Sequence, residues 1–280
     1  MDGNRSQRRE RRSPRSADSV TEVSNPVQSL SRALDLLEAI AAADGGMALT
    51  ELAHATKLAP STTHRLLKSL EQRGYAVHDD ERGRWFIGVQ AFSVGGAFLR
   101  GRNYLVLARP FMRALMEQAG ETVNLAIEDQ GEAVYLSQVE CREMMRAFSR
   151  PGSRAPLHCS GVGKALLAAL TPDDVAAIVA ARGLARVTSG TITEPEVLDR
   201  ELATIRRQSY AVDDEEHAVG LRCVAATIHD EHGLPLAALS VSGPTARIPV
   251  ERVAELGELV ARSAAEITRA VGGHLPERTG

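Results

Sequence analysis

The residues best suited to chemistry in this 280-residue chain begin with a glycine-rich run at residues 160–164. Gly161 and Gly163 are spaced to open a helix, whose first amide groups have no partner within the helix and lie at the positive end of its dipole. A carboxylate would bind well at such a helix end. A nucleotide site is not indicated, because a Walker A loop requires glycine where His158 stands and serine or threonine where Ala165 stands.

Polar residues further along the chain are spaced to join this helix end in one site. Asp213 opens an acidic run, and Cys223 follows ten residues later. Ser240 and Ser242 are two residues apart, so they share one face if they lie on a strand. These four side chains and the helix end together predict a pocket for a small anion.

The same residues permit two other chemistries. An enzyme could use Cys223 as nucleophile, His217 or His229 as base and Asp213 to orient the base, because a cysteine and a histidine need only meet in space. The spacing does not require this arrangement. The run from His229 to His232 lacks the H-E-x-x-H spacing of a zinc site. The sequence therefore predicts no catalytic residue, no metal site and no cofactor.

The first third of the chain has the pattern of a helix-turn-helix. Apolar residues at helical spacing over 27–40 predict a first helix, which ends before two glycines. Thr50 is the predicted N-cap of a short second helix, and residues 57–60 form a short connector. Ser61 is the predicted N-cap of a third helix, which ends at Gly74.

The third helix has an apolar face and a polar, basic face. The apolar residues, at i, i+3, i+4 and i+7 spacing, are Thr63, Leu66, Leu67 and Leu70. The outward residues are Ser61, Thr62, His64, Arg65, Lys68 and Ser69. Short polar and basic side chains at the start of a recognition helix suit the major groove. We predict that Arg65 and Thr62 contact base edges and that Lys68 contacts a phosphate.

Two alternating strands after this helix, around a turn at Gly83, predict a hairpin wing. Arg82 and Arg84 lie near its tip, within reach of the neighbouring DNA backbone or minor groove. The complete set of predicted DNA-binding residues is Thr50, Ser61, Thr62, His64, Arg65, Lys68, Arg82 and Arg84.

The second half of the chain reads as an antiparallel sheet with flanking helices. Strands are predicted over 121–127 and 133–139, and again over 221–228 and 236–242, each pair joined by a glycine turn. Capping boxes are predicted to start helices at Thr171 and Thr193, and a long helix closes the chain. The predicted fold class is α+β.

Composition narrows the class of protein. The chain is 44% hydrophobic and 25% charged, which is typical of globular proteins. Its longest apolar stretch, 162–170, contains Lys164 and is shorter than the roughly 20 residues of a membrane span. The basic start lacks the apolar region of a signal peptide, and three cysteines without C-x-x-C spacing fit a reducing compartment. These features predict a cytoplasmic protein with no membrane partner.

Several segments taken together resemble the IclR family of regulators across residues 25–273. The segments are VQSLSRALDLLEAI, LTELAHATKLAPSTTHRLLKSLEQRGY, PLHCSGVGKALLA and YAVDDEEHAVGLRCVAATIHDEHGLPLAALSVSGPTAR. The resemblance implies a winged helix-turn-helix over 25–90, a linker helix over 91–106 and a GAF/PAS-like α/β effector-binding domain over 107–275. Residues 1–24, rich in arginine and serine, are predicted to be a disordered basic tail.

The resemblance also implies a function and a site. It implies a homodimer or homotetramer that binds operator DNA, most often as a repressor, under the control of a small organic acid. The implied ligand-binding residues are Gly161, Val162, Asp213, Cys223, Ser240 and Ser242, with Met144 and Leu221 as the apolar wall. A pocket without arginine favours a compact 2-oxo acid such as glyoxylate or pyruvate. The alternative is an activator with an aromatic-acid or lactone effector, which the 4% aromatic content disfavours.

Asp213 poses a physical difficulty, because its carboxylate would repel a bound acid. Three arrangements remove the difficulty: a protonated side chain, a hydrogen bond from a backbone amide, or an interaction with a hydroxyl or carbonyl hydrate of the ligand. The sequence does not distinguish among them.

Overall fold

The computed structural model describes residues 27–100, 103–144 and 149–276. The predicted basic tail at 1–24 lies outside the described residues. The chain divides into two compact units, Met1–Phe98 and Leu99–Gly280. None of the helices within the described ranges is long and apolar enough to cross a membrane.

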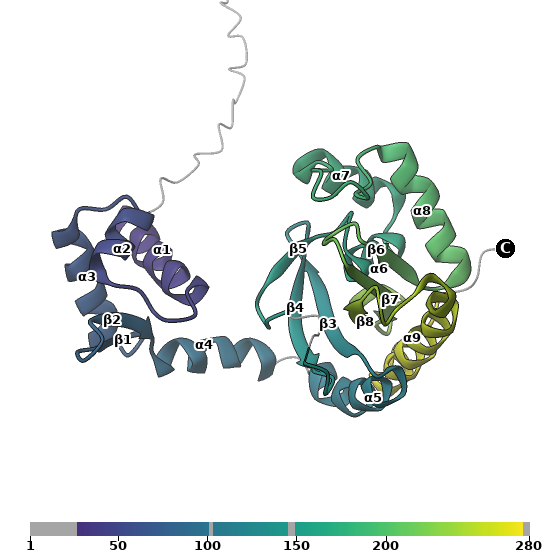
Figure 1. The fold of residues 1–280 in the computed structure, drawn as a ribbon, viewed down its shortest axis with the longest axis horizontal. Coiled ribbons are helices and arrows are strands. Elements are labelled where there is room, and N and C mark those ends of the chain that lie inside the picture. Colours follow the sequence, from purple (N-terminus) through teal and green to yellow (C-terminus); the bar gives the residue numbers. More distant parts are fainter. Residues whose placement is uncertain (1–26, 101–102, 145–148, 277–280) are drawn as a thin grey trace, which may run out of the picture. The chain divides into compact units, whose positions relative to one another are not determined.

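The described part of the first unit begins with three helices and a hairpin (Figure 1), in the order α1 (Gln28–Ala42), α2 (Leu49–Ala55), α3 (Pro60–Gln72), β1 (Ala76–Asp79) and β2 (Arg84–Ile87), and most of a further helix follows them. β1 and β2 pair antiparallel, and an isolated bridge joins Met47 to Trp85. The buried core of this unit contains Leu36, Ile40, Leu52, Leu67, Ala76 and Trp85. The predicted helix-turn-helix with a hairpin wing is confirmed.

Both predicted caps in this unit are wrong by two positions. The N-cap of α2 is Ala48, whose amide donates to the Glu51 carboxylate at 2.9 Å, so Thr50 lies within the helix. The N-cap of α3 is Ala59, because Pro60 has no amide hydrogen to satisfy and its fixed φ suits the first helical position. Ser61 therefore also lies inside its helix.

Two helices occupy the region where a single linker helix was predicted over 91–106. They are α4 (Val89–Arg100) and α5 (Asn103–Ala119), and residues 101 and 102 between them lie outside the described residues. α5 continues well beyond residue 106 because Ala108, Met112 and Leu115 recur at helical spacing and are buried.

The second unit contains a six-stranded antiparallel sheet in the order β5-β4-β3-β8-β7-β6. The central strands are β3 (Thr122–Asp129), β8 (Pro235–Pro244) and β7 (Leu221–His229). β4 (Glu132–Val139) and β5 (Arg154–Pro156) lie on one side of them, and β6 (Ala211–Asp214) forms the other edge. The predicted α+β class and antiparallel sheet are confirmed.

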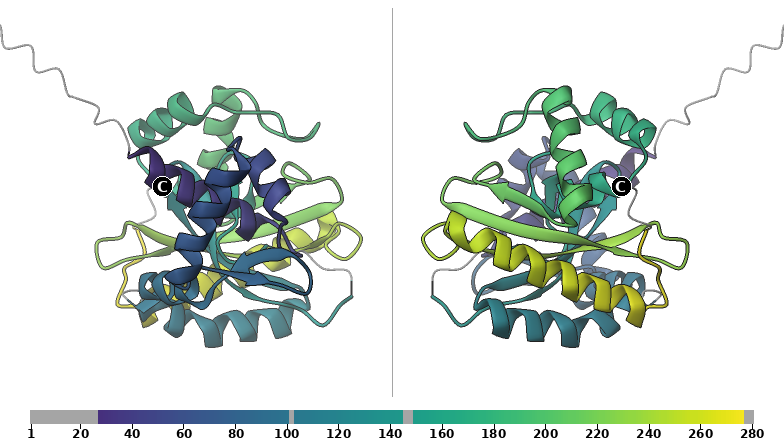
Figure 2. Two further views of the ribbon diagram at one scale, coloured as in Figure 1. Left: turned by 90° about the vertical axis from the view of Figure 1, so that its left-hand side faces the viewer. Right: turned by 90° about the vertical axis from the view of Figure 1, so that its right-hand side faces the viewer.

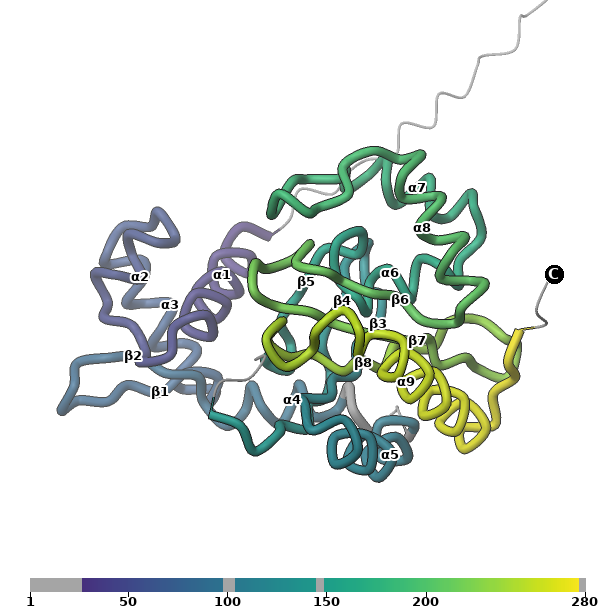
Figure 3. The backbone as a smooth tube through the Cα atoms, turned by 45° about the vertical axis from the view of Figure 1, so that its right-hand side comes forward, coloured from purple at the N-terminus to yellow at the C-terminus, as the bar shows by residue number. Residues whose placement is uncertain are grey.

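The two faces of the sheet differ in side-chain size. One face of the sheet is covered by α5 and α9 (Val250–Ala270) (Figures 2 and 3). Large apolar side chains pack there, among them Leu125, Ile228 and Leu239. The other face presents small residues such as Ala126 and Ala225 to α6 (Gly161–Ala168). Because side chains alternate along each strand, the polar residues Asn124, Cys223 and Ser240 lie on this second, α6-covered face.

Two further helices, α7 (Pro172–Arg182) and α8 (Pro195–Gln208), complete the second unit. The predicted cap Thr171 is confirmed, since its hydroxyl accepts a hydrogen bond from the amide of Asp174. The predicted cap Thr193 is wrong, because the N-cap is Glu194. The Thr193 hydroxyl instead accepts a hydrogen bond from Arg186 at 3.2 Å.

The burial of Leu67 predicts its contribution to the stability of the winged unit. Leu67→Ala should lower the free energy of unfolding by about 2–5 kcal/mol, because it removes a fully buried side chain from a small core. Urea unfolding followed by the fluorescence of Trp85, the single tryptophan, measures this. Glu38→Ala, at an exposed position of α1, is the control and should change stability by less than about 0.5 kcal/mol. Equal effects of the two variants would contradict the described core.

Candidate effector site and DNA-binding surface

The N-terminus of α6 packs directly against β7. Ser160 is its N-cap and accepts a hydrogen bond from the amide of Gly163 at 3.2 Å. A Cβ at position 161 would lie 2.7 Å from the Sγ of Cys223, and a Cβ at position 163 would lie 2.4 Å from the Leu157 backbone. Both glycines are therefore required for close packing, which brings the helix end onto the sheet.

The register of the sheet gathers the predicted polar side chains beside this helix end. Asp213 on β6 pairs with Cys223 on β7, which in turn pairs with Ser242 on β8. Ser240 lies two residues along β8 on the same face. All four residues are buried. The structure thus brings Gly161, Val162 and these four residues together, as the sequence predicted.

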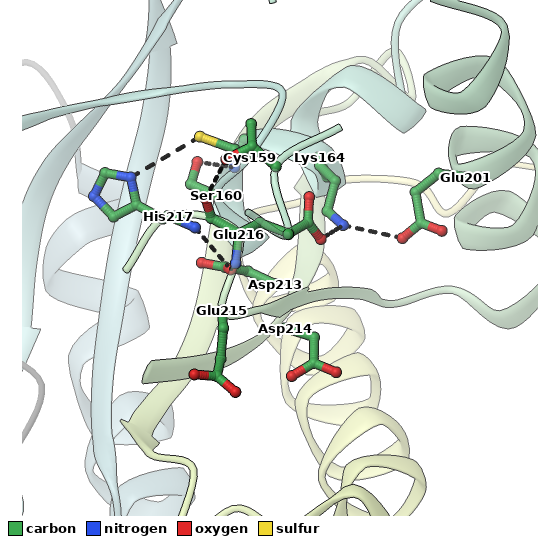
Figure 4. Close-up of polar contacts among 12 residues, drawn as sticks. Cys159, Ser160, Lys164, Glu201, Asp213, Asp214, Glu215, Glu216 and His217 are labelled. Carbon is green, nitrogen blue, oxygen red and sulfur yellow. Dashed lines mark hydrogen bonds and ion pairs between the residues drawn. The ribbon is translucent and has the colours of Figure 1, made fainter. Parts of the chain in front are cut away.

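Asp213 accepts two backbone hydrogen bonds. The amides of Glu216 and His217 donate to its Oδ1 at 2.9 and 3.2 Å (Figure 4). Burial nevertheless raises the pKa of Asp213 to about 7, and the negative charge of Glu216 adds to this effect. Two of the three arrangements considered for Asp213, protonation and an amide hydrogen bond, are thus both available at neutral pH.

The buried cysteines of the site are poor nucleophiles. Burial raises the pKa of Cys223 to about 11 and that of Cys159 to about 12, so both thiols remain protonated near neutral pH. His217 Nδ1 lies 4.0 Å from the sulfur of Cys159. Asp213 bonds to amides instead of orienting an imidazole, so the arrangement of an activated cysteine is not formed.

A polar ladder on β3 and β4 extends the site and was missed from the sequence. Asn124 Nδ2 donates to the Ser242 hydroxyl at 3.5 Å, and Gln138 Nε2 donates to Asn124 Oδ1 at 3.0 Å. The buried hydroxyl of Ser240 lies beside the Cys223 thiol and makes no hydrogen bond of standard geometry within the described part of the chain. Only the pairing register could reveal this ladder, because Asn124 and Ser242 are separated by 118 positions.

The two residues predicted to form an apolar wall are placed differently. Leu221 is partly buried at the start of β7, two residues from Cys223. Met144 is 97% exposed, so it forms no wall of the buried cluster in this structure. It lies in a segment outside the named strands and helices, where strand alternation gives no guidance.

A buried ion cluster beside the site was also missed. Lys164, on α6, pairs with Glu201 of α8 at 3.1 Å and with Glu216 (Figure 4). The sequence showed Lys164 only as an interruption of an apolar run. A lysine flanked by valine, glycine and alanine on a helix is a signal for a buried charge that requires a partner.

The DNA-binding unit presents the predicted polar face of α3. Thr63 and Leu67 are buried, whereas Ser61, His64 and Arg65 are exposed and Thr62 is partly buried. This division follows the predicted helical face.

Of the remaining residues predicted to contact DNA, some make contacts within the protein and others are exposed. Lys68 is exposed, pairs with Glu71 at 2.8 Å and lies over the Trp85 ring. Arg84 donates to the Gly46 carbonyl at 2.7 Å and pairs with Glu51, so it fastens the wing to the turn before α2. Thr50 and Arg82 are exposed.

No group of three His, Cys, Asp or Glu side chains in the described ranges is placed to hold a metal ion. The run from His229 to His232 forms a turn in which Asp230 accepts hydrogen bonds from the amides of His232 and Leu234.

Comparison with known proteins identifies the family. The model of the bacterial transcriptional regulator IclR C-terminal domain matches residues 97–269, and that of the IclR helix-turn-helix domain matches residues 29–80. The chain is 46% identical to the acetate operon repressor of Salmonella typhimurium, over 94% of this chain and 97% of that protein. It is 48% identical to the transcriptional repressor IclR of Escherichia coli, over 88% and 91%. A crystal structure of the Thermotoga maritima IclR shares 31% identity and a TM-score of 0.75, over 88% and 99%. The chain therefore belongs to the IclR family of bacterial transcription regulators and is not an enzyme.

Proposed function

We propose that this protein is a transcriptional repressor that binds operator DNA through α3 and is controlled by a small organic acid bound at the N-terminus of α6. The observation that carries the effector assignment is the buried Ser240 hydroxyl, which makes no hydrogen bond of standard geometry within the described residues and lies beside the weakly accepting Cys223 thiol. A buried polar group without a partner costs free energy, and a bound ligand can supply the missing hydrogen bond. The names of the two repressors to which the chain is similar support repression over activation.

The chemistry of the site favours a compact acid with a second oxygen, such as glyoxylate or pyruvate. The helix end supplies amide donors, Ser240 and Ser242 supply hydroxyls, and a protonated Asp213 supplies one further donor. None of the residues proposed to contact the ligand is an arginine or lysine, so these neutral donors would bind its carboxylate. A larger diacid would have no cationic partner for its second carboxylate.

Control follows from thermodynamic linkage between the effector and the operator. An effector that binds one quaternary arrangement more tightly shifts the protein toward it. We propose a homodimer or homotetramer whose paired α3 helices bind half-sites about 34 Å apart in one arrangement only. We propose that it acts in the cytoplasm, because the operator DNA that it would bind is there.

Arg65 should read bases in the operator. Arg65→Ala should weaken operator binding by about 1–3 kcal/mol and relax base preference at one position of each half-site, because an exposed arginine on the recognition helix is lost. Fluorescence anisotropy with operator variants measures both effects. Arg73→Ala, at the exposed end of α3, is the control. Loss of effector binding in Arg65→Ala to the same extent would contradict separate DNA and effector sites.

Ser240 should contribute to effector affinity and not to DNA affinity. Ser240→Ala should weaken glyoxylate binding about tenfold, which corresponds to one lost hydrogen bond of about 1.4 kcal/mol. Operator affinity without effector should remain within twofold. Calorimetric titration measures the first effect, and Ser263→Ala, a buried serine of α9, is the matched control. Unchanged glyoxylate affinity in Ser240→Ala would place the ligand elsewhere.

Effector binding should weaken as the pH rises through about 7. Below this pH Asp213 is protonated and donates a hydrogen bond, and above it the carboxylate repels the acid. Glyoxylate affinity should therefore fall between pH 6 and pH 8, by no more than about tenfold per pH unit. Asp213→Asn should give a nearly flat profile in the same titration series. A flat wild-type profile, or an unchanged slope in Asp213→Asn, would show that Asp213 does not face the ligand.

A further inference from the structure

Lys164 is a fully buried lysine in the middle of a helix that otherwise packs through small and apolar side chains. Only 1% of its surface is exposed. An isolated buried ammonium group is so costly that it would lose its proton unless carboxylates compensate it. Two carboxylates do so, and they come from different parts of the unit: Glu201 from α8, and Glu216 from the segment after β6.

Glu216 belongs to the turn at residues 213–217, here called the site turn. The backbone amide of Glu216 donates to Asp213 and its side chain pairs with Lys164. One residue therefore links the buried cation to the acidic group of the effector site. Lys164 itself lies one helical turn after Gly161, so α6 carries both the buried cation and the helix end of the effector site.

The site turn has a backbone that requires external support. Glu215 has a φ of 58°, in the left-handed region that non-glycine residues rarely adopt. The hydroxyls of Thr188 and Thr191 bond the carbonyls of Glu215 and Glu216 at 2.7 and 2.8 Å. These contacts hold the carbonyl side of the turn, and the pair between Lys164 and Glu216 holds its side-chain face.

We propose that Lys164 is a positioning residue of the effector site. Its ion pair with Glu201 anchors it to α8, and its ion pair with Glu216 holds the site turn so that the amides of Glu216 and His217 stay hydrogen-bonded to Asp213. This inference rests on the proposed effector site, but its structural part can be tested without an effector. It adds no direct contact between Lys164 and the ligand.

The charges around Asp213 give this proposal a second, electrostatic consequence. The titratable groups at the cluster are Lys164 on α6, Glu201 on α8, Glu216 and His217 in the site turn, Cys159 and His158 before α6, Cys223 on β7 and Tyr135 on β4. Lys164 lowers the pKa of Asp213 and Glu216 raises it. Removing the charge of Lys164 should therefore raise the pKa of Asp213, and removing the charge of Glu216 should lower it.

The test uses three variants of the full chain and one control. They are Lys164→Met, Glu216→Gln and the double variant with both changes. The double variant removes both buried charges together, so it should fold even if a single change leaves an uncompensated charge. Arg154→Met is the control, because it removes an equal charge from two exposed ion pairs, with Asp129 at the end of β3 and Glu132 at the start of β4.

Hydrogen exchange at the site turn gives the first readout, and it requires no effector. Exchange of the amides of Glu216 and His217 should accelerate at least tenfold in Lys164→Met and in the double variant, whereas amides of α9 should be unchanged. Arg154→Met should match the wild type throughout. Unchanged exchange at the site turn in both Lys164 variants overturns the proposal.

The pH midpoint of glyoxylate binding, from calorimetry, gives the second readout. The midpoint should move up in Lys164→Met and down in Glu216→Gln. In the double variant it should stay above the wild-type value, because the two charge effects oppose each other while the weakened amide bonds no longer lower the pKa of Asp213. General disruption of the fold would not produce opposite shifts. Shifts in the same direction overturn the positioning role. If wild-type protein binds no glyoxylate, the proposed effector is wrong, and exchange at the site turn alone decides the role of Lys164.

Discussion

The close approach of α6 to β7 is the constraint on which the second unit depends. Gly161 lies where any side chain would collide with Cys223, and Gly163 lies where one would collide with Leu157. Small residues on the facing strands permit this approach, and large apolar residues occupy the opposite face. As a result, a helix end, with its first amides and positive dipole, is buried against a sheet. A buried helix end requires polar partners, and the same sheet face supplies hydroxyl, thiol, amide and carboxyl groups.

Burial also determines the charge state of these partners. The thiols are kept neutral, and Asp213 is brought close to the pH at which it exchanges a proton under physiological conditions. The single buried cation, among the described residues of this cluster, is already paired with two glutamates. Such a site can bind a small anion through neutral donors without a strong fixed charge.

The sequence predicted the elements better than the contacts between them. Helical spacing identified α3 and its buried face, and alternation identified β3, β4, β7 and β8. The glycine pair and the spacing of Ser240 and Ser242 predicted most of the residues that the structure brings together at the candidate site. Three helix starts were wrong by one or two positions, because Ala48, Ala59 and Glu194 are the N-caps in place of Thr50, Ser61 and Thr193. Asn124 and Lys164 were missed because a contact across 118 positions, or between α6 and α8, depends on register and packing that one sequence does not reveal.

We propose that the effector binds at the junction of α6 with β6, β7 and β8, and a crystal structure of the protein grown with glyoxylate would test this. Density for the ligand is expected between the first amides of α6 and the Ser240 hydroxyl, with Asp213 within hydrogen-bond distance. Density instead in the groove between α7 and α8, lined by Val175, Leu198 and Leu202, with the junction unchanged, would contradict it.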